Sequence, residues 1–203
     1  GADSITIHLR EDRRHIRDKD LIKISTDNKI ILNLEIAANL EMQKIALKNK
    51  PNFICIVPEK RKEITTEGGL NLNKNFKFLK TFIKKFNDNN IRTSLFINPT
   101  INDVVKSKLL GSNCIELHTG KISNLIKKNK NYKKELLKIK KAAMYASKLN
   151  LEVHAGHGID FKTAKVLSRI IEIKEFNIGH FIIGESIIFG LKNIIREFKR
   201  IIN

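Results

Sequence analysis

The segment SITIHL (Ser4–Leu9) runs directly into the charged segment REDRRH (Arg10–His15). Apolar and polar residues alternate along the first segment, which predicts a β-strand with one apolar face. Its polar face carries His8 and leads to Arg10. Catalytic residues of a (β/α)-barrel gather at the C-terminal ends of its strands, so this segment is typical of one strand of such a barrel. The alternative is an edge strand followed by a solvated turn.

Six further runs are predicted as strands, and several are apolar on both faces, as in a sheet covered by helices. They are Ile30–Ile36, Phe53–Pro58, Arg92–Ile97, Cys114–Thr119, Glu152–Gly156 and Asn177–Ile183. Helical spacing of apolar residues predicts helices over Asp18–Thr26, Asn39–Asn49, Asn75–Asn87, Asp103–Leu110, Tyr132–Lys148, Phe161–Ile173 and a last one through Ile187–Ile201. This alternation predicts an α/β fold, a TIM (β/α)8-type barrel with seven βα units in this chain. A doubly wound open sheet is the alternative, although no glycine-rich dinucleotide motif follows the first strand.

Two connections are longer than the others, Glu59–Leu70 and Gly120–Asn131. Long loops at the catalytic end of a barrel are usually ligand loops or lids, and Gly68-Gly69 allows the first of them to bend. The alternative for both is a tolerated insertion.

The composition predicts one globular domain over residues 1–203, since 41% of the residues are hydrophobic and 30% are charged. No apolar run approaches the roughly 18 residues of a membrane span, and no signal-peptide pattern is present, so we expect a cytoplasmic protein without a membrane partner. Cys55 and Cys114 lie in apolar runs and are predicted to be buried thiols rather than a disulfide or a metal site.

The net charge of +18 raises the alternative of a basic nucleic-acid-binding module. The lysines, however, occupy the polar sides of several predicted helices, as in Tyr132–Lys148, and aromatic residues do not alternate with them. We therefore expect no nucleic-acid partner.

Ionisable side chains recur near the ends of the predicted strands. Alternation places His8, Glu35 and Glu116 on the polar faces of three of them. A buried carboxylate is costly unless it is paired, so such groups at matching depth indicate a site rather than packing. Histidine and glutamate together favour general acid–base catalysis.

Two other chemistries remain as alternatives. His154 and His157 have the H-x-x-H spacing of some metal sites, but on a strand that ends in a glycine turn they need not converge, and we predict no metal. A Schiff-base aldolase needs a lysine at a strand end, and Lys60 is the only candidate.

Glycines near the last two predicted strands favour phosphate binding. They occur in Gly156–Gly158, in Asn177–His180 and in Gly184–Ser186, which is predicted to open the last helix. Backbone N–H groups of such loops and of a helix N-terminus form the usual phosphate site of these barrels. The alternative is that these glycines only form tight turns.

Six blocks of the sequence together resemble the pyridoxine 5′-phosphate synthase family. They are HLREDRRHI (His8–Ile16), NLE (Asn33–Glu35), VPEKRKEITTEGG (Val57–Gly69), IELHTG (Ile115–Gly120), AGHG (Ala155–Gly158) and NIGH with the following IIG (Asn177–Gly184). The resemblance implies a TIM barrel with extra helices that condenses 1-deoxyxylulose 5-phosphate with 3-amino-2-oxopropyl phosphate and releases phosphate and water. It also implies a homo-octamer that uses no metal or organic cofactor.

The same resemblance assigns roles to individual residues. It implies that His8 and Glu35 accept protons, that His157 donates one, and that Glu116 stabilises a transition state. The implied ligands of deoxyxylulose phosphate are Arg10, His15 and Thr65, and those of the aminoketone phosphate are Gly158, Gly179 and His180.

The resemblance is incomplete at the N-terminus. The family begins with a strand that carries an Asn-x-Asp-His motif, followed by an arginine, and neither occurs here. We therefore expect a seven-stranded, barrel-like sheet that is open between the Ser4–Leu9 and Asn177–Ile183 strands, and we expect residues 1–203 alone to be inactive and prone to aggregation.

Overall fold

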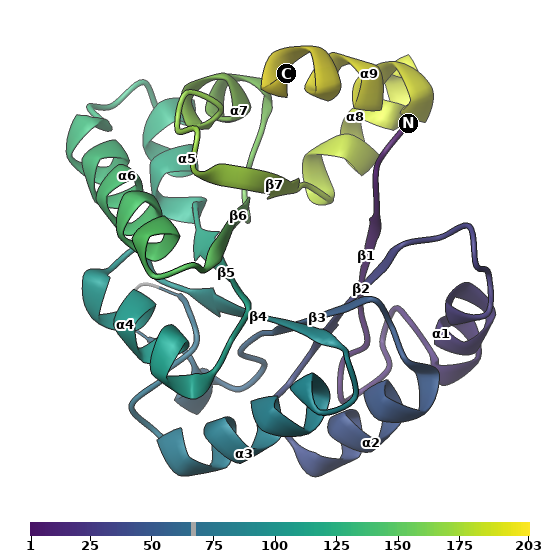
Figure 1. Ribbon diagram of the computed structural model, residues 1–203. Coiled ribbons are helices and arrows are strands. Elements are labelled where there is room, and N and C mark those ends of the chain that lie inside the picture. Colours follow the sequence, from purple (N-terminus) through teal and green to yellow (C-terminus); the bar gives the residue numbers. More distant parts are fainter. Residues whose placement is uncertain (66–67) are drawn as a thin grey trace.

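The computed structural model describes residues 1–65 and 68–203, so Thr66 and Glu67 of the predicted Glu59–Leu70 loop lie outside the described residues. Seven parallel strands form one sheet in chain order. They are β1 (Ile5–His8), β2 (Leu32–Ile36), β3 (Phe53–Ile56), β4 (Arg92–Ile97), β5 (Cys114–His118), β6 (Glu152–Gly156) and β7 (Ile173–Asn177). The sheet curls around a central space, as a barrel does (Figure 1).

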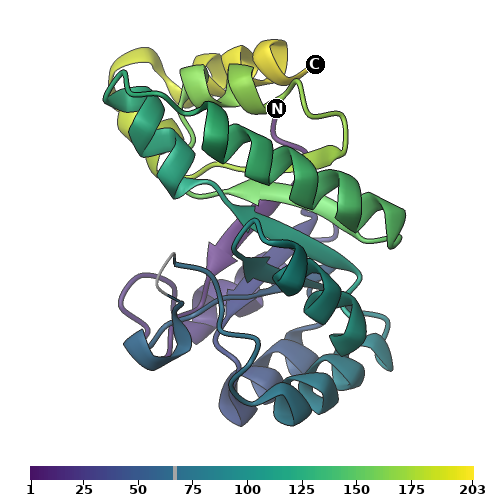
Figure 2. The same cartoon turned by 90° about the vertical axis from the view of Figure 1, so that its left-hand side faces the viewer.

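Helices surround the curled sheet (Figures 1 and 2). They are α1 (Asp18–Ser25), α2 (Leu40–Asn49), the short 3₁₀ helix η1 (Arg61–Glu63), α3 (Phe76–Asn87), α4 (Ile101–Leu110), α5 (Gly120–Lys127), α6 (Lys133–Lys148), α7 (Phe161–Leu167), α8 (His180–Phe189) and α9 (Leu191–Ile202). Most of these helices cover the outer face of the sheet, whereas α8 lies against α9 at the open edge. Three of them begin at a side-chain cap: Asn39, Thr100 and Asp160 each accept a hydrogen bond from the backbone N–H three residues later.

Alternation along the strands separates an apolar layer from a polar interior. In β2, Leu32, Leu34 and Ile36 are buried in the hydrophobic core. Asn33 and Glu35, between them, face the inside of the sheet, where the Asn33 amide donates to Thr6 Oγ1 at 3.3 Å and Glu35 lines a cavity. The core therefore lies between sheet and helices, and the interior is left for polar chemistry.

The sheet is open between β1 and β7, as expected from the sequence. In the described part of the chain no backbone ladder joins these two outer strands. Side chains bridge them instead, since Thr6 Oγ1 lies 3.0 Å from Asn177 Oδ1. Near the N-terminus, the Lys199 ammonium of α9 lies 2.7 Å from the Asp3 carboxylate. We call this boundary between β1 and the β7–α9 segment the seam.

The predicted position of the seventh strand was wrong. Strand β7 is Ile173–Asn177, and most of the predicted Asn177–Ile183 strand belongs to helix α8. Lys174 is exposed in β7, which an outer strand with one neighbour tolerates. Consequently Gly184–Ser186 lies inside α8 and opens no helix.

Two further predictions need correction. The predicted Gly120–Asn131 loop contains helix α5, and the predicted last helix is two helices separated at Gly190, whose φ of 79° is left-handed. Helix α9 buries Ile194 and Phe198, but α8 buries no residue, and its Ile187 and Ile188 are 84% and 75% exposed. Within the described residues, no helix has both the length and the apolar character needed to cross a membrane.

Candidate active site

A cavity of about 1170 Å³ opens at the C-terminal ends of the strands and continues along the seam. Its lining includes eight of the ten residues predicted for the site: His8, Arg10, Glu35, Glu116, His157, Gly158, Gly179 and His180. They come from both ends of the chain and from its middle. The curl of the parallel sheet brings them together, because all C-terminal strand ends meet at one end of the sheet.

His15 and Thr65 do not line this cavity. His15 is exposed in the connection before α1. The Thr65 hydroxyl accepts a hydrogen bond from the Asn98 amide at 2.5 Å, and Asn98 Oδ1 accepts one from the Gly69 N–H at 3.0 Å. Thr65 is thus held in the β3–α3 connection beside the cavity. Lys60, the aldolase candidate, also lies outside the lining, and its ammonium is 3.2 Å from Glu11.

His8 lies between two carboxylates. It pairs with Glu35 in the β1–β2 ladder, and Nδ1 is 3.6 Å from Glu35 Oε2. Its Nε2 is 3.0 Å from Oε1 of Glu59, which follows β3. Burial raises the pKa of Glu35, opposed by the charge of His8. Sequence reasoning placed Glu59 at the start of the Glu59–Leu70 connection and did not include it in the site.

Glu116 is a buried carboxyl with fixed neighbours. Its Oε2 accepts a hydrogen bond from the Asn177 amide at 2.9 Å, and the Cys55 thiol lies 3.7 Å from the same oxygen. Burial, followed by the charges of Glu35 and Glu175, raises the pKa of Glu116 to about 8. At pH 7 this carboxyl is therefore mostly neutral and can donate a proton or a hydrogen bond.

Space for Glu116 comes from a glycine in the next strand. A Cβ atom at Gly156 of β6 would lie 1.8 Å from Glu116 Oε1. Glycine at this position therefore lets the carboxyl lie directly against the backbone of β6.

His157 follows β6 in a left-handed backbone conformation, with φ at 77°. Its ring centroid is 4.9 Å from that of His118 and 6.4 Å from that of Phe96. Burial, and then the charge of Lys127, lower the pKa of His157, so the imidazole is neutral at pH 7 and its protonated form is a stronger acid than usual. His118, Phe96 and Lys127 also line the cavity, and sequence reasoning did not assign them a role.

A helix N-terminus and two glycines border the β7 side of the cavity. Helix α8 begins at His180, directly after Gly179, and no atom lies within 4 Å of a Cβ built at Gly179. Gly158 has a left-handed φ of 80° and lines the cavity together with Lys127. The helix start, the two glycines and one ammonium are suited to a phosphate. The helix N-terminus beside these glycines is at His180 instead of the predicted Gly184.

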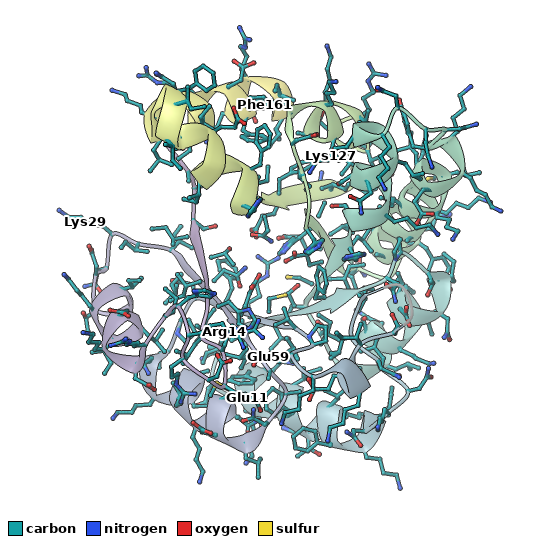
Figure 3. All side chains as sticks on the ribbon, turned by 180° about the vertical axis from the view of Figure 1, so that it is seen from behind. Glu11, Arg14, Lys29, Glu59, Lys127 and Phe161 are labelled. Atoms are coloured by element: carbon teal, nitrogen blue, oxygen red, sulfur yellow. The ribbon has the colours of Figure 1, made fainter. Side chains whose placement is uncertain are left out.

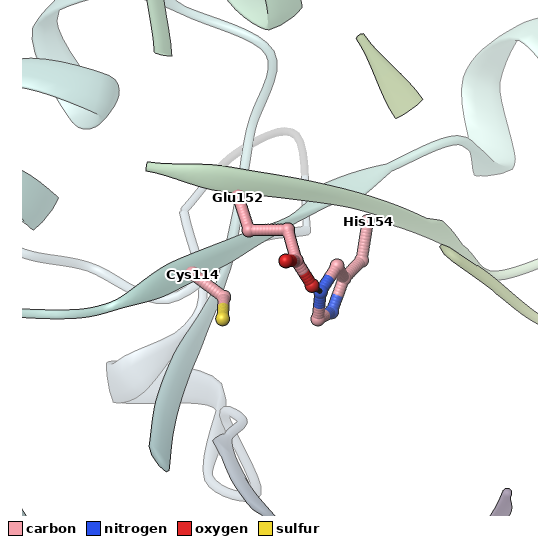
Figure 4. A group of neighbouring side chains, drawn as sticks. All are labelled: Cys114, Glu152 and His154. Carbon is pink, nitrogen blue, oxygen red and sulfur yellow. Dashed lines mark hydrogen bonds and ion pairs between the residues drawn. The ribbon is translucent and has the colours of Figure 1, made fainter. Parts of the chain in front are cut away.

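A second cluster lies away from the mouth, where Cys114, Glu152 and His154 point toward one another from β5 and β6 (Figure 4). Their ligand atoms lie within 4.8 Å of one another, as in some metal sites. However, Arg92 binds Glu152 at 2.5 Å, and burial raises the pKa of Cys114 to about 12 although Arg92 opposes this. His154 Nε2 lies 2.9 Å from Glu152. We interpret the cluster as a partly buried ion-pair network, so the two histidines of the H-x-x-H spacing have different surroundings.

The sequence pattern of a protein family described as pyridoxal phosphate biosynthesis protein PdxJ matches residues 1–203. The chain is 64% identical over 203 residues to the pyridoxine 5′-phosphate synthase of Pelagibacter ubique (strain HTCC1062), a match that covers 100% of this chain and 85% of that protein. It is 47% identical over 205 residues to the enzyme of the same name from Sulfurihydrogenibium sp. (strain YO3AOP1), with 100% and 84% covered.

Among solved structures, the fold resembles 3-keto-L-gulonate-6-phosphate decarboxylase from Vibrio cholerae O1 biovar El Tor, with a TM-score of 0.66, 13% identity, and 97% of this chain and 86% of that chain covered. At this identity the likeness shows only a shared barrel-type fold. The family pattern and the relatives extend over all 203 residues. The chain therefore belongs to the PdxJ family of pyridoxal phosphate biosynthesis proteins.

Proposed function

We propose that this protein is a pyridoxine 5′-phosphate synthase that condenses 1-deoxyxylulose 5-phosphate with 3-amino-2-oxopropyl phosphate and releases phosphate and water. The observation that carries the proposal is that His8, Glu35, Glu116 and His157 line one shared cavity in a chain of the PdxJ family. Joining an amine to a ketone forms an imine and releases water, and closing an aromatic ring requires further eliminations. Each of these steps moves protons, which such side chains can transfer.

His8 and Glu35 act in this proposal as proton acceptors, and His157 acts as a proton donor. The position of His157 in the cavity lining supports its role, and because its pKa is lowered, the ring must first take up a proton from another group and then donates it readily. Glu116 stabilises a transition state. Its raised pKa, about 8, supports this role, because a neutral carboxyl can donate a hydrogen bond to oxygen on which negative charge develops.

The two substrate phosphates occupy opposite sides of the cavity in this proposal. Arg10, His15 and Thr65 bind deoxyxylulose phosphate. Gly158, Gly179 and His180 bind the aminoketone phosphate, supported by the helix that begins at His180. His15 and Thr65 reach the substrate only if their segments move toward the cavity that Arg10 lines.

The proposal extends to the state of the protein in the cell. It is a cytoplasmic homo-octamer that needs no metal or organic cofactor and has no nucleic-acid or membrane partner. Residues 1–203 form one barrel domain, supported by one hydrophobic cluster that includes both Ile7 and Phe198. The free, buried thiols of Cys55 and Cys114 fit a reducing compartment.

Mixing both substrates with the protein expressed from its complete gene tests the activity, with the product detected by liquid chromatography and mass spectrometry. We expect pyridoxine 5′-phosphate to form in the presence of EDTA, to depend on both substrates, and to be lost in His8→Asn but not in Lys29→Ala, a change in the α1–β2 connection. Loss of activity in EDTA with rescue by zinc indicates a metal-dependent hydrolase instead. Borohydride trapping of substrate on Lys60 indicates a Schiff-base aldolase.

A further inference from the structure

Glu59 is a buried carboxylate that uses both oxygens on fixed partners. Its side chain is 5% exposed. Oε1 lies 3.0 Å from His8 Nε2, and Oε2 accepts a hydrogen bond from the Glu11 backbone N–H at 3.1 Å. Figure 3 shows Glu59 beside Glu11 below the central space.

The turn after β3 holds Glu59 in this position. Oε2 of Glu63 accepts hydrogen bonds from the backbone N–H groups of both Glu59 and Lys60, each at 3.0 Å. In front of the turn, the Val57 N–H donates to the Ile36 carbonyl at 3.0 Å and continues the β2–β3 ladder. The Glu59 carboxylate is thus attached to the same rigid sheet that carries His8.

These contacts determine which ring nitrogen of His8 bears the proton. A neutral imidazole has one donor and one acceptor nitrogen, whereas an ionised carboxylate only accepts. The 3.0 Å contact to Glu59 has hydrogen-bond length, but the 3.6 Å contact between Nδ1 and Glu35 does not. In a neutral His8 ring, Nε2 therefore carries the hydrogen, and the Nδ1 lone pair faces Glu35.

We propose that Glu59 is the positioning residue of His8: it holds the imidazole in the Nε2–H tautomer, so that Nδ1 is the atom that accepts a proton on the Glu35 side. The catalytic part of this proposal rests on the proposed function, in which His8 is a base. The tautomer itself does not depend on it.

The substitution Glu59→Gln replaces one of the two carboxylate oxygens with an NH₂ group and so tests the contact to His8. A glutamine has one acceptor oxygen and one NH₂ donor. If the oxygen stays with the Glu11 N–H, the NH₂ group faces Nε2, which must then become the acceptor, and the hydrogen moves to Nδ1. The base is then in the wrong tautomer while the shape of the site is retained. We expect kcat to fall by about 10²–10⁴-fold with KM changed less than about threefold.

The tautomer is measured directly by ¹⁵N NMR of the His8 ring at pH 8, with His8→Asn used for assignment. We expect the Nε2–H form in the wild type and in Glu59→Asp, which keeps both oxygens, and the Nδ1–H form in Glu59→Gln. The kcat of Glu59→Asp should also be at least about tenfold higher than the kcat of Glu59→Gln. The matched control is Glu41→Gln, an α2 glutamate whose side chain is 64% exposed, and it should leave tautomer and kcat unchanged.

Three outcomes overturn the proposal. They are an Nδ1–H tautomer or an imidazolium at His8 of the wild type at pH 8, an unchanged tautomer in folded Glu59→Gln, and a kcat for that variant within about twofold of the wild type. The wild-type spectrum decides the matter even if Glu59→Gln does not fold. If the wild type has no synthase activity but the tautomer switches as expected, the proposed function fails and the positioning of His8 by Glu59 stands.

Discussion

Because Glu116 is buried, its protonation contributes to the free energy of unfolding, which therefore depends on pH. Its folded pKa, about 8, is above the value of an exposed glutamate, so the native state binds the proton more tightly than the unfolded state does. This stabilisation is complete below about pH 4.5 and is lost progressively as the pH rises to about 8.

The variant Glu116→Gln tests this, because an amide resembles the neutral carboxyl and does not ionise. Relative to the variant, the wild type should lose about 1–3 kcal/mol of unfolding free energy between pH 5.5 and pH 8.5. Urea denaturation of both proteins at the two pH values gives the number. Equal pH dependence in the two proteins would contradict the buried, neutral state of Glu116.

His154 and His157 provide a second residue-level test, since three positions separate them but their surroundings differ. His157→Asn should lower kcat by about 10²–10⁴-fold with little change in stability, because the His157 side chain lines the cavity and makes no ion pair in the described part of the structure. His154→Asn should lower the unfolding free energy by about 0.5–1.5 kcal/mol, because it disrupts the partly buried contacts to Glu152 and Glu175, and leave kcat within a few fold. Thermal unfolding and steady-state kinetics measure the two effects. Equal losses of kcat would mean that the histidines act as a pair.

At the scale of elements, the packing of the Glu116 side chain of β5 against β6 depends on a glycine. Gly156→Ala should displace the Glu116 carboxyl, because the new Cβ would lie 1.8 Å from Oε1, and should lower stability by about 1–3 kcal/mol together with activity. Gly184→Ala in α8 is the matched control, because no atom lies within 4 Å of its Cβ position. There the better helix propensity of alanine should raise stability by about 0.5–1 kcal/mol. Urea denaturation and steady-state kinetics of the two variants measure these effects. A Gly156→Ala variant with unchanged stability and activity would contradict the close packing of Glu116 against β6.

Most elements could be predicted from the sequence, and the exceptions have physical reasons. Strands β1 to β6 show a period of two or a continuous apolar run, which predicts strands from the sequence alone. Strand β7 has Lys174 exposed beside the partly buried Glu175 on an outer edge, and α8 is apolar enough in Phe181–Ile183 to resemble a strand. Only the pairing of β6 with Ile173–Asn177, a tertiary contact, distinguishes the two possibilities.

The site was predictable to a similar degree. The inward direction of strand residues such as Glu35 and Glu116 follows from alternation. In a strand, successive side chains point to opposite faces of the sheet, so the sequence pattern predicts the face of each one. Glu59 and His118 could not be assigned by this reasoning. Their importance depends on distances to His8 and His157, which belong to other strands and connections.

At the scale of the whole molecule, the open seam should produce a gradient of stability across the sheet. Strands β4 and β5 are paired on both sides, whereas β1 and β7 are paired on one side only in the described part of the chain. Amides of β1 and β7 that face the seam should therefore exchange with solvent fastest, and those of β4 and β5 slowest. Hydrogen exchange measured by NMR or mass spectrometry on the 203-residue chain tests this. Uniform protection from β1 to β7 would indicate that the seam is closed by backbone pairing in solution.

The division of each strand into an outward apolar set and an inward polar set has a consequence for how such a sequence can change over generations. Leu34 belongs to the outer core and Glu35 lines the cavity, and the same holds for Ile115 and Glu116. Neighbouring residues in the sequence are thus under different selection, one for packing and the other for the cavity. Substitutions that repack the outer layer can accumulate without touching the reaction, and inward substitutions can alter the reaction while the scaffold persists.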